Sequence, residues 1–264
     1  MDNSAKKISK PFHRLWRPVR GYDWAAANFI IDNDCSPKAT LDYLQDDRFA
    51  NQDEKKSLFM ATRLIIRDLN ELFDYIEPDD ENLKVHSHRI YELLLRTATE
   101  FEANCKGILK ANNYSKEEKC WDIKDYFKIS RAARLSEYRV IFQRWSTSHE
   151  FQPLLAWNPS RRETLLWYDA YNKVKHDRFK EFKSASLENL MNAVAGLLSI
   201  LHAQYGEDMA EVGFSGIGTT GVREGDVETE MFTIHAPVFP DAEQYDFIWD
   251  KIKDDANPVE TYLF

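Results

Sequence analysis

Apolar side chains recur at helical spacing in four separate stretches of the chain. The stretches begin near residues 53, 82, 160 and 186, and each places its apolar residues on one side of a helix. Such a stripe is stable only when another element covers it, so we expect an antiparallel helical bundle. The stripes are Leu58, Ile65, Leu69, Leu72 and Ile76; Ile90, Leu94, Phe101, Cys105 and Ile108; Trp167, Tyr171 and Val174; and Leu187, Leu190, Met191, Val194, Leu197, Leu198 and Leu201.

Local signals mark the ends of the helices and the segments between them. Pro78 stops the first helix, and the last begins with Ser186 as its cap and ends at Gly206. Residues 115–118 have the form of a capping box, which predicts a shorter helix directly after Ser115. Residues 138–145 are rich in β-branched and aromatic side chains, which predicts a strand or hairpin arm in the middle of the chain.

The same signals divide the chain into three parts. Residues 1–50 are expected to form an irregular arm, apart from a short helix that starts near Ser36, with Phe12, Trp16, Tyr22 and Trp24 holding it to the main domain. Residues 51–205 are the helical bundle. Residues 206–264 contain several glycines and prolines and are expected to form a mixed β and irregular tail, with a strand over 227–235 and a short helix over 245–252. The predicted fold class is therefore mainly α with a short β element.

Composition restricts the class of protein. The hydrophobic share of 43%, with 13% aromatic residues, is sufficient for a packed core. No apolar run approaches the roughly 20 residues that cross a bilayer, so we expect no membrane association. Residues 1–10 are charged and do not resemble a secretory signal. The three cysteines form no close pair and no metal-type spacing, which favours reduced thiols and a cytoplasmic location.

The net charge of −9 is unevenly distributed. Residues 206–264 carry fourteen acidic against three basic side chains, whereas residues 1–205 have 32 basic and 30 acidic ones. Two stretches of the body are locally basic: 119–145, with seven cations against three anions, and 161–183, with seven against four. Such a stretch attracts phosphates, and the acidic tail could lie over it or dock on a partner; both stretches are otherwise ordinary solvated faces.

One helix carries a row of residues able to do chemistry. With about 100° per residue, Asp169, Asn172 and His176 fall on the face opposite the apolar stripe of their helix. Histidine exchanges protons near neutral pH, and a neighbouring carboxylate can orient it. Lys173, Lys175 and Arg178 flank the row as candidate phosphate-binding cations. The alternative is a polar row that faces water or fixes helix packing.

The segment 171–178, Tyr-Asn-Lys-Val-Lys-His-Asp-Arg, followed at once by a leucine-rich helix, resembles the HEPN family (higher eukaryotes and prokaryotes nucleotide-binding). The resemblance covers residues 55–205 as architecture and only 171–178 as motif. It implies a helical bundle, a homodimer, and in many members a ribonuclease that needs no metal and serves bacterial defence. Asn172 matches the polar residue of the family motif and His176 its histidine, while Tyr171 stands at the arginine position.

Three functions follow from these patterns. The first is a HEPN-like module that binds RNA or a nucleotide in a stress or defence system. The second is an active endoribonuclease, in which His176 transfers a proton at the ribose 2′-hydroxyl and Lys175 or Arg178 steadies the phosphate. The third is an adaptor for protein partners. No cofactor or metal is expected.

Other chemistries lack their patterns in this sequence. The glycines of 213–218 are not followed by the Lys of a phosphate loop, and Gly213-Phe-Ser215-Gly216 is one residue short of a serine nucleophile elbow. His86 and His88, two residues apart, would point to different sides of a helix, which argues against a shared metal ion.

Overall fold

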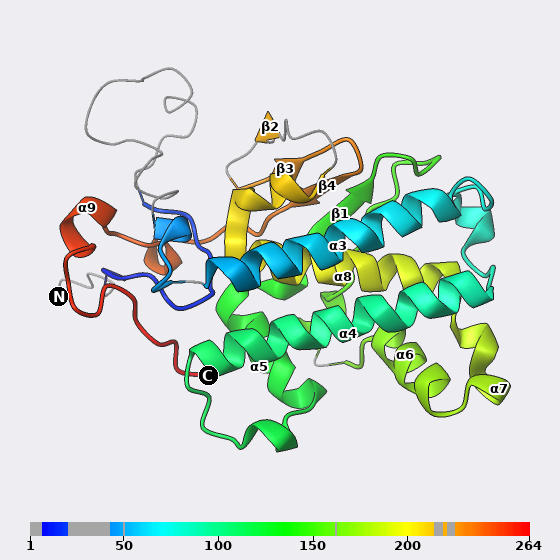
Figure 1. Cartoon of the computed structure of the whole chain (residues 1–264), viewed down its shortest axis with the longest axis horizontal. Helices are drawn as coiled ribbons and strands as arrows, with labels where there is room; N and C mark the ends of the chain where they lie inside the picture. The colour runs from blue at the N-terminus through cyan, green and yellow to red at the C-terminus, as the bar shows by residue number, and fades with distance from the viewer. Residues whose placement is uncertain (1–6, 21–42, 50, 162, 214–218, 221–224) are drawn as a thin grey trace.

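The computed structural model describes residues 7–20, 43–49, 51–161, 163–213, 219–220 and 225–264. Within these ranges the long helices are α3 (Gln52–Leu72), α4 (His88–Ala111) and α8 (Leu187–Tyr205). The shorter ones are α5 (Ile123–Ala133), α6 (Leu166–His176), α7 (Arg178–Glu181) and α9 (Trp249–Ile252). Short strands form one small sheet, so the protein is mainly α with a small β element, which confirms the fold class (Figure 1).

The three long helices lie side by side and enclose the core (Figure 1). The α4 stripe is confirmed in full, because its five predicted residues, Ile90 to Ile108, are all 0% exposed. Helix α3 runs antiparallel to α4, as expected (Figure 1). Helix α8 starts beside the start of α4, where the Leu187 amide donates to the Val85 carbonyl at 2.8 Å. It therefore runs in the same direction as α4 and antiparallel to α3.

Two expectations about helix ends and lengths were wrong. Residues 160–182 do not form a fourth long helix, because the backbone leaves the helix at Asp177 (φ −141°) and α7 begins a new one. The capping box is not at 115–118 but at Asp122, whose side chain accepts from the Lys124 amide, with Asp125 binding back to the Asp122 amide. A motif of capping residues occurs often by chance, and the one used here is seven residues downstream of Ser115.

The end signals of α8 are confirmed. Ser186 caps the helix by accepting from the Asn189 amide at 3.3 Å. Gly206 ends it with a φ of +54°, a left-handed conformation that favours glycine. A Cβ atom at Gly206 would lie 2.3 Å from the Trp16 ring, and one at Gly225 would lie 2.6 Å from the same ring. The two glycines thus make the slot that holds Trp16.

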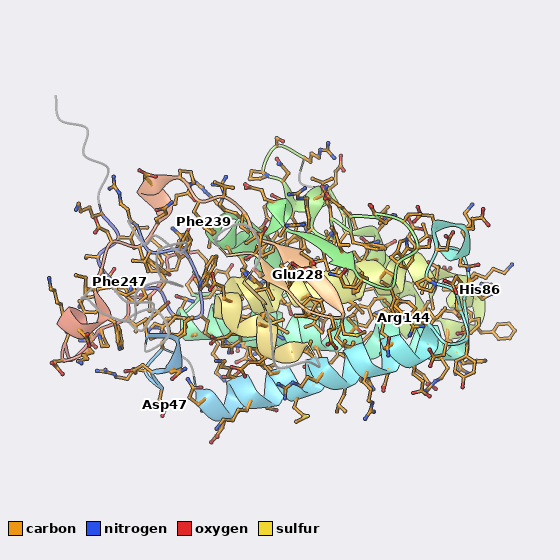
Figure 2. The ribbon with its side chains drawn as sticks, turned by 90° about the horizontal axis from the view of Figure 1, so that it is seen from above. Asp47, His86, Arg144, Glu228, Phe239 and Phe247 are labelled. Carbon is orange, nitrogen blue, oxygen red and sulfur yellow. The ribbon has the colours of Figure 1, made fainter. Side chains whose placement is uncertain are left out.

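The tail and the body share one sheet, with strand order β1-β4-β3-β2. Strand β1 (Arg139–Phe142) comes from the predicted strand of the body, and β2 (Thr219–Thr220), β3 (Val227–Glu228) and β4 (Phe232–His235) come from the tail. Val140 pairs with Ile234 in the antiparallel register, and both are 0% exposed. Seen from above, the sheet lies over α8, and Arg144 just after β1 reaches α3, donating to the Asn70 side-chain oxygen at 2.8 Å (Figure 2).

The N-terminal arm is held by the tail and by α8. The Trp16 amide donates to the Ala203 carbonyl at 2.8 Å, and Phe12 forms a bridge with Glu260. The predicted anchoring role of Trp16 is confirmed, because its ring packs on His202 of α8, whereas among the described residues the Phe12 ring packs on the rings of Tyr245 and Tyr262 of the tail and not on those of the main domain. Tyr22, Trp24, Cys35 and the start of the short helix expected from Ser36 lie outside the described residues, whereas residues 43–45 are described and are helical.

The acidic tail packs on the first of the two basic stretches. Glu243 accepts from Arg134 at 3.2 Å, and β4 pairs with β1 inside that stretch. A second contact is buried: Lys55 of α3 lies 2.5 Å from Asp208, with both side chains less than 10% exposed. Among the ion pairs between described residues, none joins the tail to the second basic stretch, 161–183. The cations of that stretch that the structure describes are all exposed.

None of the helices formed by the described residues is both long and apolar enough to cross a membrane. Cys105 and Cys120 are free thiols. Burial raises the pKa of the Cys105 thiol well above its usual value, which keeps it protonated and unreactive.

Candidate functional site

Helix α6 carries the predicted row, and its apolar stripe fixes its orientation. Trp167 packs edge-on against Phe101 of α4 and donates from Nε1 to the Pro153 carbonyl at 2.9 Å. Tyr171 and Val174, one and two turns further on, are also buried. Because these side chains face α4 and α8, the opposite face of α6 points outward, as the sequence predicted.

The outward row is not assembled as a unit. The Asp169 carboxylate lies 2.8 Å from the Lys173 ammonium, an i,i+4 pair on the surface of α6. His176 is exposed at the last residue of the helix. Seven residues of helix separate it from Asp169, a rise of about 10 Å, so this carboxylate does not orient the imidazole. Asn172, between them, is half-buried.

Tyr171 occupies the position of the family's arginine and has a different role. Its side chain is 1% exposed, and its hydroxyl accepts from the Lys175 ammonium at 2.9 Å. The same ammonium lies 4.9 Å from the centre of the Tyr171 ring. The hydrogen bond that Lys175 donates to Tyr171 is the main cause that raises the pKa of Lys175. Lys175 therefore stays charged and is held against α6.

The chain turns outward after α6, and this turn exposes a group of cations. Asp177 caps α7, and the Arg178 guanidinium lies 5.9 Å from the Tyr91 ring of α4. Phe179 is 95% exposed. Phe182 packs back on His86 and His88 at the start of α4. We name as the basic edge the five exposed cations Lys173, Lys175, Arg178, Lys180 and Lys183.

A pocket of about 710 Å³ lies beside the start of the basic edge. Asp169 and Lys173 line it from α6, Asn189 and Asn192 line it from α8, and Arg161 from the preceding loop. His176 is not part of its wall. Of the six predicted site residues, the structure thus brings only Asp169 and Lys173 together in one hollow.

Sequence reasoning missed the histidines that do have carboxylate partners. His149 Nδ1 lies 2.7 Å from Asp80, and His235 Nδ1 lies 2.9 Å from Asp226. The residues of the first pair are 69 positions apart, so no local spacing could have indicated them. Among the described residues, no group of three or more His, Cys, Asp or Glu side chains is arranged to hold a metal ion. The glycine-rich segment 214–218 and Arg162 lie outside the described residues.

Comparison of the chain with protein-family models, with curated proteins and with solved structures finds no match.

Proposed function

We propose that the chain binds RNA through the basic edge, within a bacterial stress or defence system. The proposal rests on one observation: residues 173–183 contain five exposed cations and one exposed aromatic ring. That stretch has five cations against two anions, although the whole chain has a net charge of −9. Phosphate groups would therefore be attracted to this edge and repelled by the acidic tail.

The exposed ring of Phe179 supports nucleic acid rather than a simple anion as the ligand. A phenylalanine that is 95% exposed gains nothing from burial in this chain. It stands between Arg178 and Lys180 in the sequence. An aromatic ring flanked by cations is the arrangement on which nucleic-acid bases stack while the phosphates are neutralised beside them.

Binding rather than cleavage is the function that the geometry favours. His176 is exposed beside Lys175 and Arg178, as a ribonuclease would require, but Asp169 is paired with Lys173 and Tyr171 supplies no cation. Without a guanidinium at the motif position, its stabilisation of the charged transition state is lost. The resemblance of 171–178 to the HEPN motif is consistent with a scaffold that keeps the ligand without the reaction.

Fluorescence anisotropy with a labelled RNA of about 20 nucleotides tests the proposal. We expect the affinity to fall steeply with salt, since each neutralised phosphate contributes about −0.7 to the logarithmic slope for a single strand. The double variant Lys180→Gln/Lys183→Gln and the single variant Phe179→Ala should each weaken binding roughly tenfold. Lys56→Gln/Lys251→Gln is the matched control, because it removes two exposed lysines from α3 and α9.

Two outcomes contradict the proposal. One is an affinity that the control variant lowers as much as the edge variants do, and the other is no salt-dependent binding by the parent. Incubation of the same RNA with the parent and with His176→Ala, followed by gel analysis, separates binding from cleavage.

The resemblance also implies a homodimer, and the cysteine pattern favours a cytoplasmic location; we include both in the proposal. Sedimentation velocity of the full chain, with and without RNA, gives the oligomeric state. A monomer at all concentrations would remove the dimer from the proposal and leave RNA binding unaffected.

A further inference from the structure

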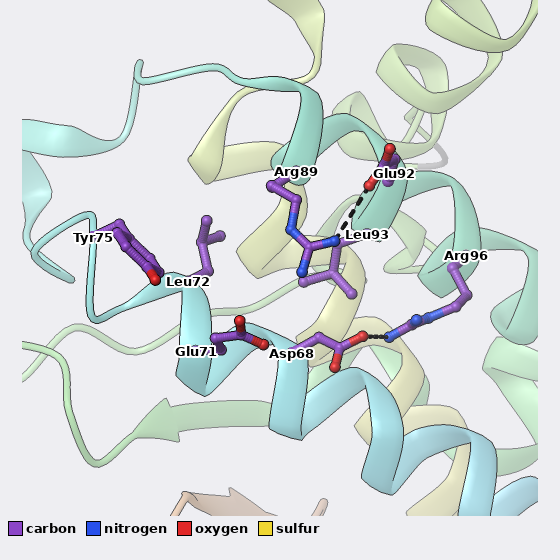
Figure 3. A pocket seen from close by; sticks show the side chains of 8 residues that line it. All are labelled: Asp68, Glu71, Leu72, Tyr75, Arg89, Glu92, Leu93 and Arg96. Carbon is purple, nitrogen blue, oxygen red and sulfur yellow. Dashed lines mark hydrogen bonds and ion pairs between the residues drawn. The ribbon is translucent and has the colours of Figure 1, made fainter.

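A second pocket lies away from the basic edge, in the groove between α3 and α4. Its volume is about 470 Å³. The side chains of α3 and α4 face one another across it (Figure 3). Leu72 and Leu93, which are 7% and 6% exposed, form its apolar floor, and Tyr75 stands at one end with 82% of its surface exposed. The groove therefore offers a ligand an apolar floor and an exposed aromatic ring.

One pair of charges in the groove is already neutralised. Asp68 accepts from Arg96 at 2.7 Å and from Arg67 at 3.0 Å. Burial alone would raise the pKa of Asp68, but the hydrogen bonds from Arg96 and Arg67 outweigh it, and the pKa is lowered. Asp68 and Arg96 thus form a fixed, paired wall at one end of the groove.

Two other charges face each other without pairing. Among the described residues, Arg89 of α4 forms an ion pair with Glu92 of its own helix, at 3.5 Å, and 67% of its side chain is exposed. No ion pair or side-chain hydrogen bond among the described residues engages the Glu71 carboxylate on α3. A guanidinium and a carboxylate on opposite walls are therefore both available to a ligand in the groove (Figure 3).

The mixture of charges selects the type of ligand. A simple anion would be repelled by Glu71 and Glu92, and a simple cation by Arg89 and Arg96. A zwitterion can present its carboxylate to Arg89, which suits the planar donor fork, and its ammonium to Glu71. An apolar or aromatic side chain on the same ligand would lie on Leu72 and Leu93 and against the Tyr75 ring.

We propose that this groove binds a free amino acid with an apolar or aromatic side chain. The pocket is large enough for one such molecule, and its polar groups match the two charged ends of that molecule. The proposal is independent of RNA binding, because none of the residues of the basic edge lines this groove.

Isothermal titration calorimetry of the full chain with L-phenylalanine tests the inference. We expect a dissociation constant of about 1 mM, typical of a small ligand in an open, hydrated groove. N-acetyl-L-phenylalanine lacks the ammonium and L-phenylalaninamide lacks the carboxylate, so each should bind roughly tenfold more weakly. Equal binding of either analogue, or no binding of L-phenylalanine at about 10 mM, would overturn the proposal.

Variants of the protein supply the complementary test. Arg89→Gln and Glu71→Gln each remove one exposed charge from the groove and should each weaken L-phenylalanine binding roughly tenfold. Arg131→Gln on α5 and Glu230→Gln in the tail remove the same charges from exposed positions elsewhere and should leave binding unchanged. Circular dichroism melting checks that all four variants are folded. Parent-like affinity in both groove variants would also overturn the proposal.

Discussion

Tyr171 shows how one residue can keep a motif's position and change its chemistry. The sequence correctly placed it on the apolar stripe of its helix, and the structure finds the ring buried. The pattern could not show that its hydroxyl accepts a hydrogen bond from the Lys175 ammonium, because that bond depends on which side-chain rotamers the packed helix allows. The same holds for His176. Periodicity predicted its place on the outward face, but it could not show that no carboxylate of the described residues pairs with the imidazole.

Tyr171→Arg is expected to destabilise the fold rather than to restore a family active site. The new guanidinium would replace a ring that is 1% exposed, next to the Lys175 ammonium. Burying an unpaired charge beside a like charge should lower the free energy of unfolding by about 3 kcal/mol. Urea denaturation measures the loss, with Tyr75→Arg, at an 82% exposed position, as the control. Parent-like stability of Tyr171→Arg would show that the site can accept the family's arginine.

His202 gives the protein a defined pH dependence. Its ring is 0% exposed, with Nε2 2.7 Å from the Gly225 carbonyl, so Nε2 donates and Nδ1 accepts from the Tyr138 hydroxyl at 3.0 Å. Burial lowers the pKa of His202 to about 4, from an ordinary value of 6.5. Between these values the unfolded chain binds the proton and the folded one does not, so stability falls as pH falls through this window.

We therefore expect the free energy of unfolding to drop by about 3 kcal/mol from pH 7 to pH 4 through this group alone. Burial also lowers the pKa of His13, which adds a change of the same sign. The measurement is thus a comparison of urea denaturation of the parent and of His202→Gln across the window. A parent and variant with equal pH slopes would show that His202 is not the group responsible.

At the scale of the element, the apolar stripes of the helices were predicted better than the residues at which the helices begin and end. The α4 and α8 stripes and the Ser186 cap were read correctly, because buried apolar periodicity and a capping hydroxyl are both local properties. The start of α4 was placed six residues too early, since residues 80–82 form a short 3₁₀ turn and Ser87 supplies the cap. The direction of α8 relative to α4 depends on the connection through α5 and α6, which no stripe encodes.

The capping box of α5 supplies a test at this scale. Asp122→Ala removes the side-chain acceptor for the Lys124 amide at 2.8 Å and should lower the free energy of unfolding by about 1 kcal/mol. Ser115→Ala, at the box expected from the sequence, is exposed and should change stability by less than about 0.5 kcal/mol. Chemical denaturation compares the two variants. An equal loss in both would mean that residues 115–118 also stabilise a helix start.

At the scale of the whole molecule, the acidic tail and the nearly neutral remainder of the chain differ in charge, but they do not fold as two independent domains. The tail supplies three of the four strands of the sheet, and Trp16 of the arm sits between a glycine that ends α8 and a glycine of the tail. The arm and the end of the tail also meet, although they lie more than 200 residues apart in sequence, as when Glu260 pairs with Phe12. Composition indicated where the acidic segment begins, and only the three-dimensional packing shows that it completes the core.

Deletion of residues 207–264 is accordingly expected to unfold the chain. The deletion removes Phe232 and Ile234, both 0% exposed, and uncovers Trp16 and Val140. Each fully buried apolar side chain contributes about 2 kcal/mol, and a domain has only about 5–15 kcal/mol in total. Circular dichroism and limited proteolysis should show lost helix and rapid cleavage. Because the deletion is expected to unfold the chain, it cannot test whether the tail repels polyanions. The full-length variant Glu228→Gln/Glu230→Gln, which neutralises two exposed carboxylates, tests that repulsion instead. If the truncated chain instead melts cooperatively near the parent's temperature, the tail is an independent appendage and the sheet contributes little to the core.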